Sequence, residues 1–323
     1  MRTNRNTRWR NILRCTGAVA MAVFLVAQTA VRAAPLQDYA AASAAYHTGR
    51  FDPNTGLEYV LSSSDDGAGR QRALVGLMEG NCVPWHDHPI PVSAGAVMEV
   101  DPASRTMRAD TLNNTIFSEM SGYLCVLYRV DAGDSGLPSG APLSLIFRTA
   151  VQGTLLTDAP HPAIIASSHA YRVTDRSLIT LDRIAEDRAW HRELLGGSGI
   201  AFGQNVLFCS TNDPVPLGGD PWYTYDPQTG QYRYDSRERL VSLHVGDLLL
   251  VTDFLWIRTL ADANGIVHNA DFWNTFTSTA VPAPGFEGVQ LVPQVLIIPE
   301  PASTVLLASA ACLLALGRRR LRY

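Results

Sequence analysis

Alternating apolar and polar positions dominate the middle of the chain. Seven segments are rich in Val, Ile, Leu and aromatic residues and are bounded by Gly, Pro, Asp or Asn, as strands are. They are 94–100, 123–130, 143–150, 164–173, 200–208, 240–253 and 289–298. Two other stretches predict helices, the alanine-rich 36–46 and the segment 182–195, which would bury Ile184, Trp190 and Leu194 or Leu195. The pattern therefore predicts a mainly β fold, an antiparallel β-sandwich or jelly-roll-like domain with one or two short helices.

One five-residue turn occurs twice, at 52–56 and 226–230, and 101–104 is a partial copy. Its proline presets φ, its Asp and Thr bond the local backbone, and its glycine accepts a positive φ. Two pairs of tyrosines flank the second copy, Tyr223 and Tyr225 before it and Tyr232 and Tyr234 after it. This alternation predicts a hairpin, whose tyrosines either form cross-strand pairs on a sheet or offer an aromatic surface to sugar rings.

The first 33 residues differ in composition from the rest of the chain. They carry six arginines and no acid, and an apolar run from Cys15 to Val26 follows most of these arginines. Val31 and Ala33 then place small or aliphatic residues where signal peptidase requires them. We expect a secretory signal peptide over 1–33, cut between Ala33 and Ala34; an uncut N-terminal anchor is the alternative.

The C-terminal 25 residues, 299–323, have three parts in a fixed order. Pro299, Glu300 and Pro301 come first, then fifteen uncharged residues from 302 to 316, then a cluster made of Arg318, Arg319 and Arg320. A helix of that length spans about 22 Å, short of the roughly 30 Å hydrocarbon core. The arginines would stay in the cytoplasm, so the segment predicts a transient membrane insertion during export.

This order of Pro-Glu-Pro, short apolar helix and arginine cluster closely resembles the PEP-CTERM sorting signal. The resemblance implies a Gram-negative bacterium and recognition of the tail by an exosortase, a membrane-embedded cysteine enzyme that removes it. It also implies association with exopolysaccharide and the biofilm matrix, at the cell surface or outside it. An ordinary tail anchor is the alternative. The resemblance covers 299–323 alone, so the domain 34–298 is not identified by it.

The formal net charge of −4 hides an acidic body. Ten of the 26 basic residues and only one of the 30 acidic residues lie in the two end segments, which leaves residues 34–298 with a net charge of −13. Nucleic acid and anionic lipid are bound through clustered Lys and Arg, so the charge argues against both as partners of the body. Within the body, Cys82, Cys125 and Cys209 allow one disulfide and one thiol, and the sequence does not choose the pair.

The best candidate for metal chemistry is the segment from Trp85 to Pro89. In an extended segment His86 and His88 project from the same face, so two imidazoles could converge on Zn²⁺. A third ligand would come from elsewhere, and the eligible residues are Glu79, Glu99, His161 and His169. The alternative is a polar loop closed by prolines.

Two weaker patterns are also compatible with ordinary turns. Residues 133–136 resemble the nucleophile segment of chymotrypsin-like serine proteases, but Leu137 stands where that family has glycine and no Ala-Ala-His segment precedes them, so we expect a loop. The acid-rich turns 64–67 and 262–265 offer oxygen ligands to Ca²⁺, although neither has the spacing of a known calcium loop, and solvated turns are the simpler interpretation.

The sequence thus favours a non-enzymatic exported surface or matrix protein. The alternative is a secreted metal-dependent hydrolase that uses His86 and His88.

Overall fold

The computed structural model describes residues 36–51, 53–54, 58–79, 81–112, 117–156, 164–193, 202–210, 223–226, 228–236, 238–260 and 269–297. The expected signal peptide and the apolar sorting helix lie outside these ranges. No helix within them is long and apolar enough to cross a bilayer. The chain divides into two units: 37–296 forms one, and the other contains Leu36 and Ile297, which pair through two backbone hydrogen bonds of 3.1 Å.

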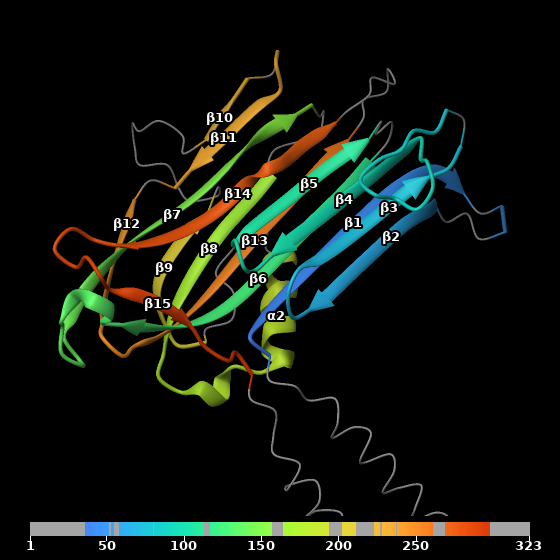
Figure 1. Ribbon diagram of the computed structural model, residues 1–323. Helices are drawn as coiled ribbons and strands as arrows, with labels where there is room; N and C mark the ends of the chain where they lie inside the picture. Colours follow the sequence, from blue (N-terminus) through green and yellow to red (C-terminus); the bar gives the residue numbers. More distant parts are fainter. Residues whose placement is uncertain are drawn as a thin grey trace, which may run out of the picture. The chain divides into compact units, whose positions relative to one another are not determined.

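The large unit consists of two antiparallel sheets (Figure 1). The first sheet has the order β2 (Glu58–Gly67), β1 (Asp38–Phe51), β6 (Phe117–Asp131), β13 (Leu248–Leu260), β8 (Ile164–Val173), β9 (Gln204–Ser210), and β15 (Gln290–Pro293) also pairs with β6. The second has the order β10 (Tyr223–Tyr225), β11 (Gln231–Asp235), β7 (Pro142–Leu155), β14 (Ala270–Pro282), β5 (Thr106–Leu112), β4 (Ala94–Asp101), β3 (Gln71–Leu77), and β12 (Arg239–His244) also pairs with β7.

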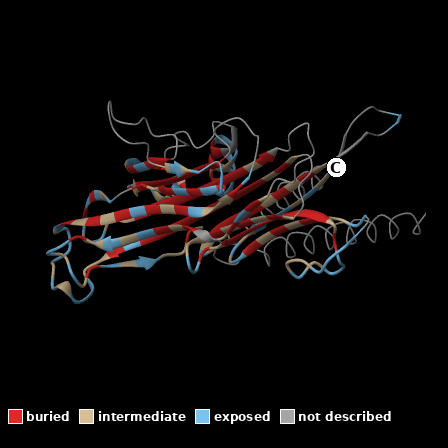
Figure 2. Cartoon of the chain, turned by 90° about the horizontal axis from the view of Figure 1, so that it is seen from above, coloured by how far each residue is buried: buried red, intermediate tan, exposed pale blue. Residues whose placement is uncertain are grey.

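The core is formed by buried residues from strands of both sheets. Buried positions form bands along these strands in Figure 2. On β13 the inward positions include Leu249, Val251 and Leu255, and on β7 they include Leu145 and Phe147. Alternate residues point to opposite faces of a strand, so each sheet contributes every second residue to one shared core. The predicted mainly β fold is confirmed, and its two antiparallel sheets are consistent with a β-sandwich.

The predicted helix over 36–46 is wrong, because this segment is most of strand β1. Alanine favours helix only weakly, and tertiary pairing overrides that preference. Strand β1 lies between β2 and β6, and Ala40, Ala41 and Ala42 on its two faces are all buried. Small side chains suit a strand that is covered on both faces, which is why the sequence looks helical and folds as a strand.

The segment 240–253, predicted as one strand, is two strands in different sheets. A turn at Gly246, whose φ is +98°, separates β12 in the second sheet from β13 in the first. Strands β2, β3, β5 and β14 were not predicted. Their Ser, Thr, Asp and Arg residues interrupt the apolar pattern because each strand faces solvent or polar partners on one side.

The predicted second helix is confirmed as α2 (Leu181–Glu193), the one α-helix of the described residues. The expected buried face is only partly right. Ile184 is buried, but Trp190 is 41% exposed, and Asp187 and His191 are buried in its place. Helix α2 therefore packs a polar stripe against the protein, and that stripe needs polar partners on the sheet.

The turn at 226–230 forms the expected hairpin. Asp226 accepts hydrogen bonds from the backbone N–H of Gln228 (2.9 Å) and from the Thr229 hydroxyl (2.6 Å), and Gly230 has a φ of +70°. These bonds lower the pKa of Asp226, with the Thr229 hydroxyl as the first cause. The partial copy at 101–104 ends differently, because Arg105 takes the positive φ (+52°) that glycine takes in the other turn.

Arg105 uses this conformation to reach a polar network within the buried interior. Its guanidinium donates to Asp253 on β13 (2.9 Å) and to Ser278 on β14 (2.7 Å), so one side chain joins both sheets. Asp253 also accepts from Ser168 at 2.5 Å, and Ser168 in turn accepts from Thr149 at 2.7 Å. Burial by itself lowers the pKa of Arg105, but the charge of Asp253 and the hydrogen bond to it more than compensate, so the pKa is raised.

Candidate functional site

The segment from Trp85 to His88 is a turn in the loop between β3 and β4. The backbone N–H of His88 donates to the carbonyl of Trp85 at 2.9 Å, and His86 and Asp87 have φ values of +43° and +54°. Two consecutive non-glycine residues in the left-handed region are uncommon and strained. The expected extended segment is therefore wrong, and the two histidines do not share a face by strand alternation.

His86 and Trp85 converge on one carboxylate. The His86 Nε2 lies 2.5 Å from Oδ2 of Asp110, and the indole N–H of Trp85 donates to the same oxygen at 3.3 Å. Asp110 lies on β5, where Met107 and Ala109 face the core and Asp110 faces outward. The side chains of His86 and Asp110 are each 19% exposed, so the pair lies at the surface of the second sheet, only partly covered.

A second tryptophan completes this cluster from a distant part of the chain. The ring of Trp273 on β14 lies 4.1 Å from the ring of His86, centroid to centroid, at an interplanar angle of 30°. Trp85 meets the His86 ring edge-on, with a centroid distance of 4.8 Å. The register of β5 and β14, in which Asp110 lies opposite Asp271, brings Trp273 next to the loop. We call Trp85, His86, Asp110 and Trp273 the two-tryptophan site.

Two glycines make room for the loop over the second sheet. Gly76 on β3 lies opposite Gly95 on β4. A Cβ at Gly95 would lie 2.7 Å from the Trp85 ring and 2.5 Å from the carbonyl oxygen of Val75. A Cβ at Gly76 would lie 2.4 Å from Val92 Cγ1. Larger residues at either position would displace the loop, so this glycine pair sets how closely Trp85 approaches the sheet.

Arg72 on strand β3 contacts the turn. Its guanidinium donates to the backbone carbonyl of His86 and lies 3.7 Å from the Asp87 carboxylate. Strand β3 faces Ala73 and Val75 to the core, so Arg72 points to the same outer face as Asp110. The guanidinium of Arg72 thus holds the backbone of His86 and lies near the carboxylate of Asp87.

The structure does not bring a third metal ligand to the two histidines. His88 Nδ1 is 2.7 Å from the carbonyl oxygen of Ile90, whereas His86 Nε2 is hydrogen-bonded to Asp110. Glu99 is buried and bound by Arg70 (2.5 Å) and Arg108 (3.2 Å). Within the described residues no group of three His, Cys, Asp or Glu side chains is placed to hold a metal ion. The Zn²⁺ site at His86 and His88 stays a prediction.

The other eligible ligands lie elsewhere. His169 is buried on β8 in the first sheet, and Glu79 is exposed in the loop after β3. His161 and the predicted calcium turn at 262–265 lie outside the described residues. The other predicted calcium turn, 64–67, is the end of strand β2, where Asp65 accepts from the Arg72 backbone N–H and Asp66 from the Tyr39 hydroxyl. Its carboxylates are thus engaged by the protein itself.

The remaining candidates have structural partners. Ser135 lies in a short 3₁₀ turn and donates to the carbonyl of Ala132 at 2.6 Å, as a loop residue. Tyr232 and Tyr234 are buried and pair across the hairpin with Tyr225 and Tyr223. The cross-strand interpretation is therefore confirmed, and these two tyrosines are not available as a sugar platform. Cys82 is exposed, Cys125 and Cys209 are buried, and no disulfide joins any two of these three cysteines.

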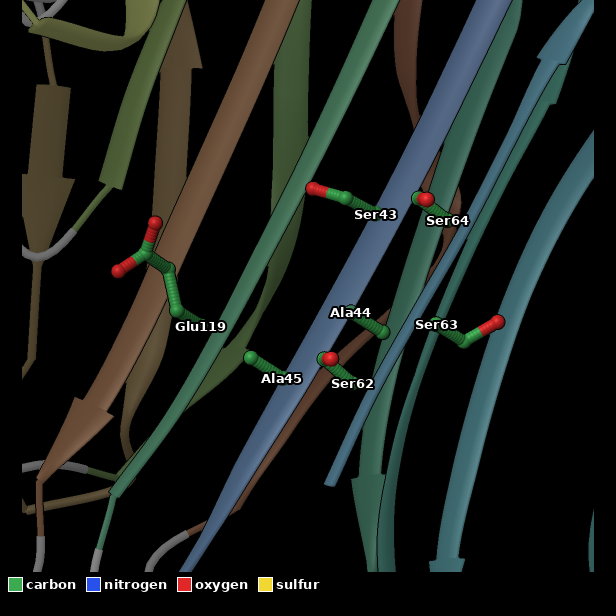
Figure 3. Close-up of a pocket in the computed structure, with 7 residues that line it drawn as sticks. All are labelled: Ser43, Ala44, Ala45, Ser62, Ser63, Ser64 and Glu119. Carbon is green, nitrogen blue, oxygen red and sulfur yellow. The ribbon is translucent and has the colours of Figure 1, made fainter. Parts of the chain in front are cut away.

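A shallow depression of about 200 Å³ lies over β1, β2 and β6 (Figure 3). Small side chains form it, since Ser43, Ala44 and Ser62 leave space that larger residues would fill. Ser43 is bonded to Ser121 at 2.7 Å. The depression offers hydroxyl groups and the carboxylate of Glu119 but has no aromatic wall, so it provides less for a ligand than the two-tryptophan site.

A separate polar cluster lies buried under α2. Asp187 accepts from the Tyr123 hydroxyl at 2.7 Å and lies 3.5 Å from His191, whose ring is 4.7 Å from that of His169. Burial raises the pKa of Tyr123 well above its usual value, and Asp187 adds to this shift. Burial, followed by the neighbouring His191, lowers the pKa of His169 well below its usual value. The cluster holds α2 on the sheet and has no opening to a substrate in the described residues.

Sequence reasoning found Trp85 and His86 but missed Asp110 and Trp273. The segment 106–112 alternates Met107, Ala109 and Thr111 with polar residues, and this weak strand signal places Asp110 on an outer face. Trp273 had no comparable signal, because its position next to His86 depends on the pairing of β14 with β5.

Comparison with known proteins identifies no family. No family model and no curated protein matches the chain. Among solved structures, it is weakly similar to the VP2 subviral particle of infectious bursal disease virus, with 9% identity and a TM-score of 0.18, over 77% of this chain and 57% of that one. It is also weakly similar to the C-terminal domain of the Streptococcus agalactiae AgI/II polypeptide BspA, with 9% identity and a TM-score of 0.16, over 82% and 88% of the two chains. Likenesses this weak carry no argument about function.

Proposed function

We propose that this protein is exported across the inner membrane of a Gram-negative bacterium and retained at the cell surface or in the extracellular matrix, in association with exopolysaccharide. An exosortase recognises the tail at Pro299, Glu300 and Pro301 and removes it with the arginine cluster. The PEP-CTERM resemblance of 299–323, combined with the signal-peptide pattern of 1–33, is the observation that carries the proposal.

The folded unit supports this proposal through the placement of its first and last strands. Asp38, at the start of β1, pairs with Val126, and Pro293, at the end of β15, pairs with Tyr128, so both ends lie side by side along β6. The core between the sheets is formed by residues from 40 to 289. Cutting the chain outside 37–296 would therefore leave the core intact.

Mass spectrometry of the exported protein tests the proposal. We expect the mature chain to begin at Ala34 and to lack 318–323. The variant Glu300→Ala should keep the tail and stay with the membrane fraction, whereas the neighbouring control Ser303→Ala should be processed normally. Exported protein that still carries Arg318 to Tyr323 would contradict the exosortase step.

The metal-dependent hydrolase remains the alternative, and the same preparation tests it. Elemental analysis would need to find a stoichiometric metal that is lost when His86 and His88 are both replaced by alanine. Such a result would replace the non-enzymatic proposal, because the two-tryptophan site would then be a metal centre.

A further inference from the structure

We infer that the two-tryptophan site binds a neutral polysaccharide on the outer face of the second sheet. The inference rests on the proposed function only for the source of the polymer, the exopolysaccharide, and the site itself is argued from its geometry. It assigns the aromatic residues Trp85 and Trp273 as stacking surfaces and Asp110 as the acceptor of sugar hydroxyl groups.

The two-tryptophan site rests on a strained backbone. His86 and Asp87 hold the left-handed conformation, which is unfavourable for a non-glycine residue. Gly76 and Gly95 leave the sheet without side chains beneath the loop. A loop that only closed a hairpin would need neither feature, since a glycine in the turn and apolar residues on the strands would be more stable.

The cluster presents aromatic rings beside a carboxylate. Indole rings are broad, apolar and rigid and lose little conformational entropy on binding. Asp110 uses Oδ2 for both Trp85 and His86, and no hydrogen bond reaches its other oxygen, Oδ1, from any described residue. A ligand with flat apolar faces and hydroxyl donors at its rim matches rings beside a carboxylate, and pyranose rings have this character.

The charges around the site select among polysaccharides. The carboxylates of Asp87 and Asp110 lie near the guanidinium of Arg72, which is already engaged with the turn. The neighbouring Arg70 and Arg108 are bound by the buried carboxylate of Glu99. The body of the protein has a net charge of −13. A polyuronate would meet repulsion at both levels, whereas a neutral polymer would not. The geometry therefore favours neutral sugars.

The two-tryptophan site lies on the outer face of the second sheet. Asp110 lies opposite Val97 on β4, and Val97 lies opposite Leu74, the middle residue of β3, so the site covers the middle of these strands. A polymer can therefore bind along this face without entering the core between the sheets.

The test measures binding of the full-length chain in detergent to a soluble linear β-glucan and, separately, to alginate of similar length. Because this chain is unprocessed, the result does not depend on the exosortase step. We expect β-glucan binding at low salt and at physiological salt, and weaker or no binding of alginate. Trp273→Ala and Asp110→Asn should each weaken β-glucan binding by about tenfold or more.

Matched variants separate a binding role from a structural one. Trp190→Ala removes a 41% exposed tryptophan on α2, far from the site in the fold, and should leave binding unchanged. Trp273→Phe should recover much of the binding lost in Trp273→Ala, because it restores an aromatic face. Thermal unfolding of each variant identifies any that fails to fold, and Asp110→Asn preserves shape if Trp273→Ala does not fold.

The inference is overturned by any of three results. The wild-type chain binds neither polymer; it binds alginate more tightly than β-glucan; or folded Trp273→Ala and Asp110→Asn bind as the wild type does. None of these results bears on whether the tail is removed, so the proposed function and this inference fail separately.

Discussion

The buried contact of Arg105 with Asp253 makes the sharpest prediction about stability. Replacing Arg105 with methionine keeps an aliphatic side chain and a non-glycine residue at the positive φ, so the backbone strain is unchanged. It leaves the Asp253 carboxylate buried without its cation. At 2.9 Å and an effective dielectric constant of about 20, the lost attraction is about 6 kcal/mol before desolvation is subtracted. We expect a net loss of about 3–5 kcal/mol in the free energy of unfolding.

Urea denaturation followed by tryptophan fluorescence measures this loss. With a slope of about 3 kcal/mol per molar urea, the unfolding midpoint should fall by roughly 1–1.7 M. The double variant Arg105→Met, Asp253→Leu should recover most of the stability, because an apolar pair can replace a buried ion pair. Arg148→Met is the matched control, since the ion pair of Arg148 with Asp235 is exposed and should be worth less than about 1 kcal/mol.

Two outcomes would refute the reasoning about this network. One is a midpoint for Arg105→Met that falls no further than that of Arg148→Met. The other is a double variant as unstable as the sum of the two single losses, which would mean that Asp253 and Arg105 stabilise the sheets through separate contacts.

Three further predictions concern pH and packing. The pKa of His169 is lowered in the fold, so the unfolded chain binds the proton more readily. The free energy of unfolding should therefore fall as the pH drops below about 6.5, by about 1.4 kcal/mol per pH unit until the folded pKa is reached. His169→Phe should remove this slope in unfolding curves taken at several pH values, and an unchanged slope would contradict the role of His169. Gly122→Val would place a Cβ 2.2 Å from Met98 Cε and 2.9 Å from Val100 Cγ2 and should cost about 1–3 kcal/mol, measured by urea unfolding; an unchanged unfolding midpoint would contradict the close packing. Gly230→Ala forces alanine to a φ of +70° beside the Leu155 carbonyl and should lower the melting temperature, which a scan of both proteins would show.

Much of the strand content could be predicted from alternation, because in residues 143–150, for example, every second side chain is buried in the core. The errors have physical causes. The alanine run in β1 has a local preference for helix, and only its pairing with β2 and β6 makes it a strand. The split of 240–253 depends on one turn at Gly246 that sends two halves to different sheets. Helix α2 was found, but its buried polar face required His169 and Tyr123 as partners on the sheet.

By itself the sequence determined the β class, the hairpin at Asp226, the acidic charge of the body and the pattern of the two end segments. These properties depend on residues that are close together in the chain or on simple sums. Only the tertiary structure decided that His86 bonds Asp110 and stacks on Trp273, and that Arg105 reaches Asp253. The residues of each group are separated by 24 positions or more, and strand register, which no local pattern specifies, brings them together.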